Sequence, residues 1–197
     1  LDSSAASDVY KRQFEDGEAR KLLKKWASES GMSMKVDELG SMFLKREGTE
    51  NDALPVVIGS HLDTQPTGGK YDGVLGVLAG LEVVRTLNDL NIETKKPILV
   101  VNWTNEEGSR FPPAMMASAG YAGIYDTKTL LAATDHEGNI FGEELDRIGW
   151  KGTEPVGKEK FHCYYELHIE QGPILENENI DIGVVTHGQG LKWLEVK

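Results

Sequence analysis

Residues 54–107 decide the fold of this chain, and they read LPVVIGSHLDTQPTGGKYDGVLGVLAGLEVVRTLNDLNIETKKPILVVNWTNEE. Residues 54–60 form an almost continuously apolar run, which is typical of a strand buried on both faces. A helical pattern with one apolar side follows over residues 74–88, and residues 97–104 form a second buried strand. Because the order is strand, helix, strand, we predict an α/β fold in which a mainly parallel mixed sheet lies between helices, in three αβα layers.

Weaker patterns extend this unit in both directions. Residues 16–29 carry apolar side chains on one helical face, and two extended runs, 32–36 and 41–45, suit a hairpin with Gly40 in the turn. Further along the chain, the patterns predict helices over residues 114–123 and 141–148 and strands over residues 161–170 and 180–186.

Composition limits the classes of function. The 39% of apolar residues is enough for a packed core. The 21 basic and 32 acidic residues leave a net charge of −11, which argues against a nucleic-acid surface. The longest apolar stretch, residues 73–81, is shorter than the ~20 residues that a membrane-spanning helix needs, and no export signal opens the chain. We therefore expect a cytoplasmic globular protein that binds neither nucleic acid nor membrane.

Both ends of the chain differ from the rest. Residues 1–13 have neither helical nor strand periodicity, so we expect a disordered tail or a sequence of foreign origin there. Residues 191–197 alternate like a strand that stops at the last residue. These patterns predict an N-terminal fragment of a larger protein, with residues 14–190 forming the first part of a domain.

Four short segments concentrate side chains that bind metal ions through nitrogen or oxygen. They are GSHLD at residues 59–63, YDG at 71–73, NEEG at 105–108 and HIEQG at 168–172. Three of them follow or end a predicted strand, and parallel sheets bind ligands beyond the carboxyl ends of their strands. The sequence therefore predicts that the segments meet at one edge of the sheet and form a hydrolase site with two metal ions.

His61, Asp63 and Asp72 supply the first part of such a site. His61 and Asp63 are two apart in an extended run, so their side chains point the same way, and Asp63 can orient the imidazole. Asp72 has two interpretations, because it can cap the helix that begins beside it or bridge two ions. The accompanying motifs favour bridging, which a carboxylate at a helix start can combine with capping.

Glu106, Glu107 and His168 supply the rest. The two glutamates are adjacent, so their side chains diverge, which allows one to bind metal while the other faces a bound water. His168 lies in a strand-like run that ends at Gly172 and Pro173. The alternatives are a pair of solvated loop glutamates and a hydrogen-bonded core histidine. The positions at the ends of predicted strands favour the functional interpretation.

At these residues the chain resembles the di-metal amidohydrolases of the aminoacylase and carboxypeptidase superfamily. Within it, the chain is most similar to the hydantoinase/carbamoylase branch, which includes N-carbamoyl-L-amino-acid hydrolases, β-ureidopropionases and allantoate amidohydrolases. Residues 59–73, 105–111 and 168–173 carry the resemblance, which extends over residues 14–197. His168 separates this branch from superfamily members with an acidic ligand at the equivalent place.

The resemblance implies a role for each of these residues. The implied metal ligands are His61, Asp72, Glu107 and His168, with Asp72 shared between the two ions. Glu106 would be the general base, Asp63 would orient His61, and Gln171 would contact the substrate. Nitrogen and oxygen ligands without a thiolate suit Zn²⁺ first, and also Mn²⁺, Co²⁺ or Ni²⁺.

The implied activity is hydrolysis of the ureido C–N bond of an N-carbamoyl amino acid, as in an N-carbamoyl-L-amino-acid hydrolase or a β-ureidopropionase. The alternatives are an allantoate amidohydrolase, an aminoacylase or a dipeptidase with the same metal core, and a non-catalytic fragment or binding module. The branch also implies a homodimer with a lid and dimerisation domain, which residues 191–197 would begin. Because a distal metal ligand of the branch is missing, we expect the 197-residue chain alone to be inactive.

Overall fold

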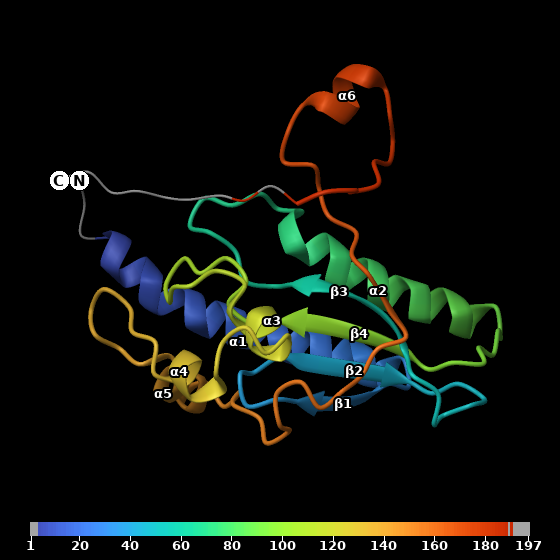
Figure 1. Ribbon diagram of the computed structural model, residues 1–197, viewed down its shortest axis with the longest axis horizontal. Coiled ribbons are helices and arrows are strands. Elements are labelled where there is room, and N and C mark those ends of the chain that lie inside the picture. Colours follow the sequence, from blue (N-terminus) through green and yellow to red (C-terminus); the bar gives the residue numbers. More distant parts are fainter. Residues whose placement is uncertain (1–3, 189, 191–197) are drawn as a thin grey trace.

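A five-stranded mixed sheet forms the centre of the fold (Figure 1). The computed structural model describes residues 4–188 and residue 190. The strands are β1 (Ser33–Val36), β2 (Met42–Arg46), β3 (Val56–His61), β4 (Ile98–Trp103) and β5 (Cys163–Tyr165). They lie in the order β1-β2-β4-β3-β5, so the two strands of the 54–107 unit occupy neighbouring places.

The sheet joins an antiparallel half to a parallel half. β1 pairs with β2 and β2 with β4 in antiparallel fashion, which confirms the predicted hairpin. β3 pairs in parallel with β4 on one side and with β5 on the other. The helix α2 (Asp72–Asp89) makes the crossover from β3 to β4, and the predicted α/β fold is confirmed. The parallel half is the part that carries the ligand-rich segments.

Helices cover one face of the sheet and an aromatic cluster covers the other. On the first face α2 packs closely against β3 and β4, and the Arg85 guanidinium of α2 lies 5.7 Å from the ring centre of Trp26 in α1 (Ser4–Glu29). On the second face Trp103 packs against Phe43 and against Tyr121, the last residue of α3 (Met116–Tyr121), with ring centroids 5.9 and 5.2 Å apart. The central strand β4 is therefore buried between two layers.

Three short helices complete the described chain. They are α4 (Thr127–Leu131), α5 (Phe141–Arg147) and α6 (Ile174–Glu178). Figure 1 shows α6 on a loop that projects away from the sheet. Among residues 4–188, no helix combines the length and the apolar character that a bilayer crossing requires.

Three predicted elements differ from the structure. The helix predicted over residues 16–29 begins at Ser4, because Ala, Lys, Arg, Gln and Glu favour a helix by propensity even where no apolar face marks it. The predicted strand over residues 161–170 is confined to Cys163–Tyr165. Residues 180–186 form no strand, since a strand needs a neighbour to pair its backbone groups. The strand predicted over residues 191–197 lies outside the described residues.

Alanine substitutions at the neighbouring residues Leu22 and Leu23 form a matched pair that tests the packing of α1. The Leu23 side chain is 2% exposed and the Leu22 side chain is 43% exposed. We expect Leu23→Ala to lower the free energy of unfolding by about 2–5 kcal/mol, because it leaves a cavity in the core. Leu22→Ala should change it by less than about 0.5 kcal/mol. Urea unfolding followed by circular dichroism measures both, and equal losses would contradict the packing described here.

Candidate metal centre

Three ligand side chains from distant segments meet at the carboxyl end of the parallel strands. His61 ends β3, Asp72 begins α2, and His168 follows β5. One ligand atom from each of the three lies within 4.8 Å of the other two. Ligands that share one ion at about 2.0–2.2 Å each lie within roughly 4.4 Å of one another. The cluster therefore has nearly the spacing that a bound divalent ion requires.

The register of the sheet explains why the two imidazoles lie together. Val56 is opposite Cys163 and Ile58 is opposite Tyr165. Three further residues along each strand bring His61 opposite His168. Their rings stack with centroids 5.9 Å apart and an angle of 30° between the planes. Parallel pairing of β3 with β5 thus determines the distance between the two nitrogen ligands.

The start of α2 comes very close to His61. A Cβ atom at Gly73 would lie 2.2 Å from Cδ2 of the His61 imidazole, so only a residue without a side chain fits there. His61 itself is 2% exposed. Because Gly73 follows Asp72, this close approach also brings the Asp72 carboxylate to the histidines.

Both imidazoles are held in the tautomer that a metal site needs. Nδ1 of His61 lies 2.8 Å from the backbone carbonyl oxygen of Asp63, and Nδ1 of His168 lies 2.9 Å from that of Ile169. A carbonyl oxygen can only accept, so each Nδ1 must carry the proton. Each Nε2 then keeps its lone pair for an ion.

The Asp63 carboxylate does not bind the His61 imidazole, as the sequence had predicted it would. Its Oδ1 lies 3.8 Å from Nδ1 of His61, too far for a hydrogen bond. Instead the carboxylate accepts hydrogen bonds from the backbone N–H groups of Glu106 (3.1 Å) and Glu107 (3.0 Å). Asp63 therefore orients His61 through its main chain, while its side chain anchors the loop that carries the two glutamates.

Glu106 lies beside the cluster. Its Oε2 is 3.4 Å from Nε2 of His61. Burial raises the pKa of the Glu106 carboxyl above its ordinary value, and the negative charges of Asp63, Glu107 and Glu166 add to this, while His61 opposes it. A carboxylate with a raised pKa is suited to accepting a proton near neutral pH.

Asp72 lies in the candidate cluster and does not serve as the N-cap of α2. The residue before the first turn of α2 is Tyr71, which makes no capping hydrogen bond through its side chain. Asp72 Oδ1 lies 3.1 Å from Nε2 of His168 and accepts a hydrogen bond of 3.2 Å from Nε2 of Gln171. Gln171, the predicted substrate-binding residue, thus contacts the candidate metal ligand Asp72 directly.

Glu107 lies outside the group of three ligands in the described residues. Its Oε2 accepts a hydrogen bond of 2.8 Å from Nε2 of Gln65. Its Oε1 is buried and has no hydrogen-bond partner. A buried carboxylate oxygen without a donor is costly in free energy, and a cation would satisfy it. The donor set of this site therefore fits metal ions.

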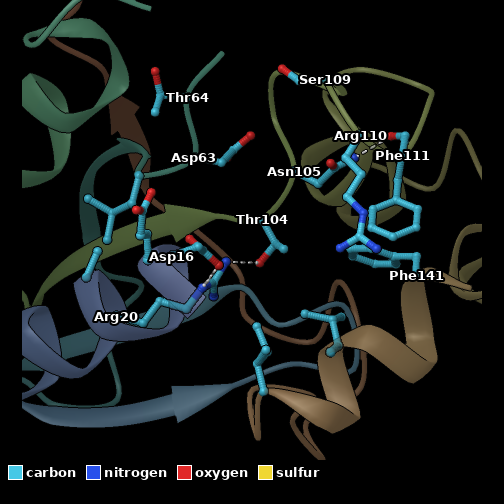
Figure 2. A pocket seen from close by; sticks show the side chains of 15 residues that line it. Asp16, Arg20, Asp63, Thr64, Thr104, Asn105, Ser109, Arg110, Phe111 and Phe141 are labelled. Atoms are coloured by element: carbon cyan, nitrogen blue, oxygen red, sulfur yellow. Dashed lines mark hydrogen bonds and ion pairs between the residues drawn. The ribbon is translucent and has the colours of Figure 1, made fainter. Parts of the chain in front are cut away.

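A cavity of about 290 Å³ is lined by residues that follow β3 and β4, among them Asp63, Thr104 and Asn105 (Figure 2). Asp63 borders it, but His61, Asp72 and His168 do not. On its floor the Arg20 guanidinium binds the Asp16 carboxylate at 2.6 Å and the Thr104 hydroxyl at 3.1 Å. Because none of the three clustered ligands lines this cavity, it is distinct from the candidate metal centre.

Two residues that contact the site did not stand out in the sequence. Gln65 lies in a loop and gave no signal. Glu166 binds the Ser60 hydroxyl next to His61. It precedes His168 by two residues in a strand-like run, and side chains at that spacing share a face. The alternation of the strand could therefore have identified Glu166.

Comparisons with known proteins agree on one family. The family described as Peptidase family M20/M25/M40 matches residues 57–196. An N-carbamoyl-L-amino-acid amidohydrolase of Rhizobium meliloti is 66% identical over 180 residues, which are 91% of this chain and 43% of that protein. A ureidoglycolate hydrolase of Oryza sativa subsp. japonica is 37% identical over 87% of this chain and 37% of its own length. The chain therefore spans less than half the length of these curated relatives.

A solved structure gives the same result. An amidase of the hydantoinase/carbamoylase family from Burkholderia multivorans superimposes with a TM-score of 0.82. It is 54% identical to this chain, and the match covers 83% of this chain and 40% of that one.

Gly73→Ala tests the close approach of α2 to His61. The added Cβ would displace the imidazole, so we expect Zn²⁺ binding to fall by at least about tenfold, a loss typical of a disturbed ligand setting. Gly69→Ala is the matched control, because its nearest neighbour would be Ile169 Cδ1 at 4.0 Å. Calorimetric titration of metal-free protein measures the affinity, with circular dichroism as a check on folding. Unchanged binding by the Gly73 variant would contradict the arrangement.

Proposed function

The chain belongs to peptidase family M20/M25/M40, and we propose that the protein carrying it hydrolyses the ureido C–N bond of N-carbamoyl amino acids with the help of divalent metal ions. The convergence of His61, Asp72 and His168 within 4.8 Å carries this proposal. The similarity to an N-carbamoyl-L-amino-acid amidohydrolase supports the choice of substrate class.

The metal ligands in this proposal are side chains with nitrogen and oxygen donors. Nε2 of His61, Nε2 of His168 and the Asp72 carboxylate would hold one ion. The partnerless Oε1 of Glu107 would bind a second ion, with Asp72 shared between the two. Divalent ions in such a pair polarise a carbonyl group and lower the pKa of a bound water. The donors suit Zn²⁺ first, and also Mn²⁺, Co²⁺ or Ni²⁺.

Glu106 is the proposed general base. Its carboxylate lies at the cluster, 3.4 Å from His61, and its raised pKa favours uptake of a proton from the attacking water. The same carboxyl group would return the proton to the leaving nitrogen. Asp63 keeps Glu106 and Glu107 in place through their backbone N–H groups, so one side chain positions both a base and a ligand.

The rest of the proposal rests on the resemblance to the hydantoinase/carbamoylase branch. Gln171 would contact the substrate from its place beside Asp72. Residues 14–190 would be the first part of the catalytic domain, and the lid and dimerisation domain would begin with residues 191–197. The whole protein would be a cytoplasmic homodimer.

The similarity to ureidoglycolate hydrolase supports a second candidate substrate. Ureidoglycolate also carries a ureido group beside a carboxylate, so the same metal core can address it. The metal ligands themselves do not discriminate between the two substrates.

A substrate panel tests the proposed reaction on the whole protein. We expect N-carbamoyl-L-amino acids to be cleaved with a kcat/KM at least about tenfold above that for ureidoglycolate, allantoate, N-acetyl amino acids and dipeptides, since each tenfold step needs only ~1.4 kcal/mol of transition-state discrimination. Released amino acid and ammonia are the measured products. Cleavage of acyl or peptide substrates alone would overturn the proposal, and preference for ureidoglycolate would select the second candidate.

The substitution Glu106→Gln distinguishes the role of a general base from that of a metal ligand. We expect a fall in kcat of about 10²–10⁴-fold, because the amide cannot accept the proton of the water, and metal content should stay unchanged. His61→Ala should instead lower the metal content per chain. Elemental analysis and steady-state kinetics measure the two effects. Retained activity in the Glu106 variant would remove Glu106 as the base.

A further inference from the structure

The carboxylate of Glu166 joins two strands next to the metal centre. Its Oε1 accepts a hydrogen bond of 2.5 Å from the Ser60 hydroxyl, and its Oε2 accepts one of 3.1 Å from the Tyr164 hydroxyl. The Tyr164 oxygen in turn accepts a hydrogen bond of 3.1 Å from Nε1 of Trp103. Ser60 and Trp103 are buried. An exposed carboxylate is therefore bound at one oxygen by a buried hydroxyl and at the other by a half-buried tyrosine that is itself bound to the core residue Trp103.

These contacts lie where the backbone pairing ends. β3 and β5 are paired from Val56 with Cys163 to Ile58 with Tyr165. His61 and His168 lie three residues further along, beyond the last of these pairs. Glu166 lies between the end of the pairing and His168, and its partner Ser60 is the residue before His61. The bond between their side chains is thus placed to continue the alignment of the two strands up to the histidines.

The helix that carries Asp72 meets the same point. A Cβ atom at Gly76 of α2 would lie 2.7 Å from the Leu167 carbonyl oxygen and 2.7 Å from Cβ of Ser60. The backbone of α2 therefore packs directly against both of the segments that Glu166 joins. A shift of residues 166–168 would change the position of His168 relative to His61 and also relative to Asp72.

We propose that Glu166 is a positioning residue that holds His168 opposite His61 by binding Ser60 and Tyr164, and so preorganises the three metal ligands. This inference rests on the metal centre proposed above. Hydrogen bonds to an ionised carboxylate are stronger than those between neutral groups, and partners that orient metal ligands typically change metal affinity by about 10–100-fold when removed.

The role of Glu166 is tested by measuring how tightly the metal-free full chain binds Zn²⁺. We expect Glu166→Ala to weaken Zn²⁺ binding by about 10–100-fold in competition with a chelating dye. The Co²⁺-substituted variant should also show a changed visible absorption spectrum, because the geometry of the ligands changes. Glu166→Gln should stay within about threefold of the parent protein, because its amide oxygen still accepts from Ser60 and its amide nitrogen can donate to Tyr164.

Glu170→Ala is the matched control. Glu170 is also two residues from His168, but its carboxylate accepts hydrogen bonds only from the backbone N–H of Leu175 among the described contacts. Its removal should leave the Zn²⁺ affinity within about twofold of the parent protein. If Glu166→Ala does not fold, Ser60→Ala removes only the hydroxyl, and a loss of affinity greater than about threefold is expected from it.

The outcomes separate this inference from the proposed function. Parent-like affinity in Glu166→Ala, or in Ser60→Ala where that variant replaces it, overturns the positioning role. Equal losses in Glu166→Gln and Glu166→Ala also overturn it, since they would make Glu166 a ligand of the ion. If His61→Ala binds Zn²⁺ as tightly as the parent protein, the metal centre itself is wrong, whatever the Glu166 variants show.

Discussion

Parallel pairing of β3 with β4 and with β5 is the constraint on which the rest of the structure depends. It turns the carboxyl ends of three strands to one edge of the sheet. His61, the loop with Glu106 and Glu107, and His168 all leave the sheet at that edge. The central strand β4 is buried along its whole length, with α2 on one face and the aromatic cluster around Trp103 on the other.

Placement of these segments at one edge of the sheet is not enough to form the site. The backbone of α2 must also pack closely against the side chains there. Gly73 and Gly76 let the first turns of α2 touch His61, Ser60 and the Leu167 carbonyl group. This contact brings Asp72 to the imidazoles. Burial of the Asp63 and Glu106 carboxyls raises their pKa values above the ordinary values. Close packing therefore supplies both the geometry and the electrostatics of the site.

Strong local patterns in the sequence predicted most of the fold. The buried strands, the crossover helix and the hairpin agree with the structure, and the predicted resemblance to the hydantoinase/carbamoylase branch is confirmed by the relatives. The predictions were wrong where the sequence pattern alone does not determine the secondary structure. The run over residues 180–186 looks like a strand but pairs with no strand among the described residues. The helix α1 extends back to Ser4 through residues that favour a helix by propensity.

The sequence by itself determined which side chains can form the site, because ligand types and their places after buried strands are local properties. It also predicted that the two strands of the 54–107 unit run in parallel, since a helical crossover joins them, whereas their adjacency is a finding of the structure. Only the tertiary structure decided how those side chains act. The Asp63 carboxylate binds two backbone N–H groups rather than the imidazole, and Glu166 binds Ser60 across 106 positions of the sequence. Such contacts depend on register and on the distance between segments, which no local pattern encodes.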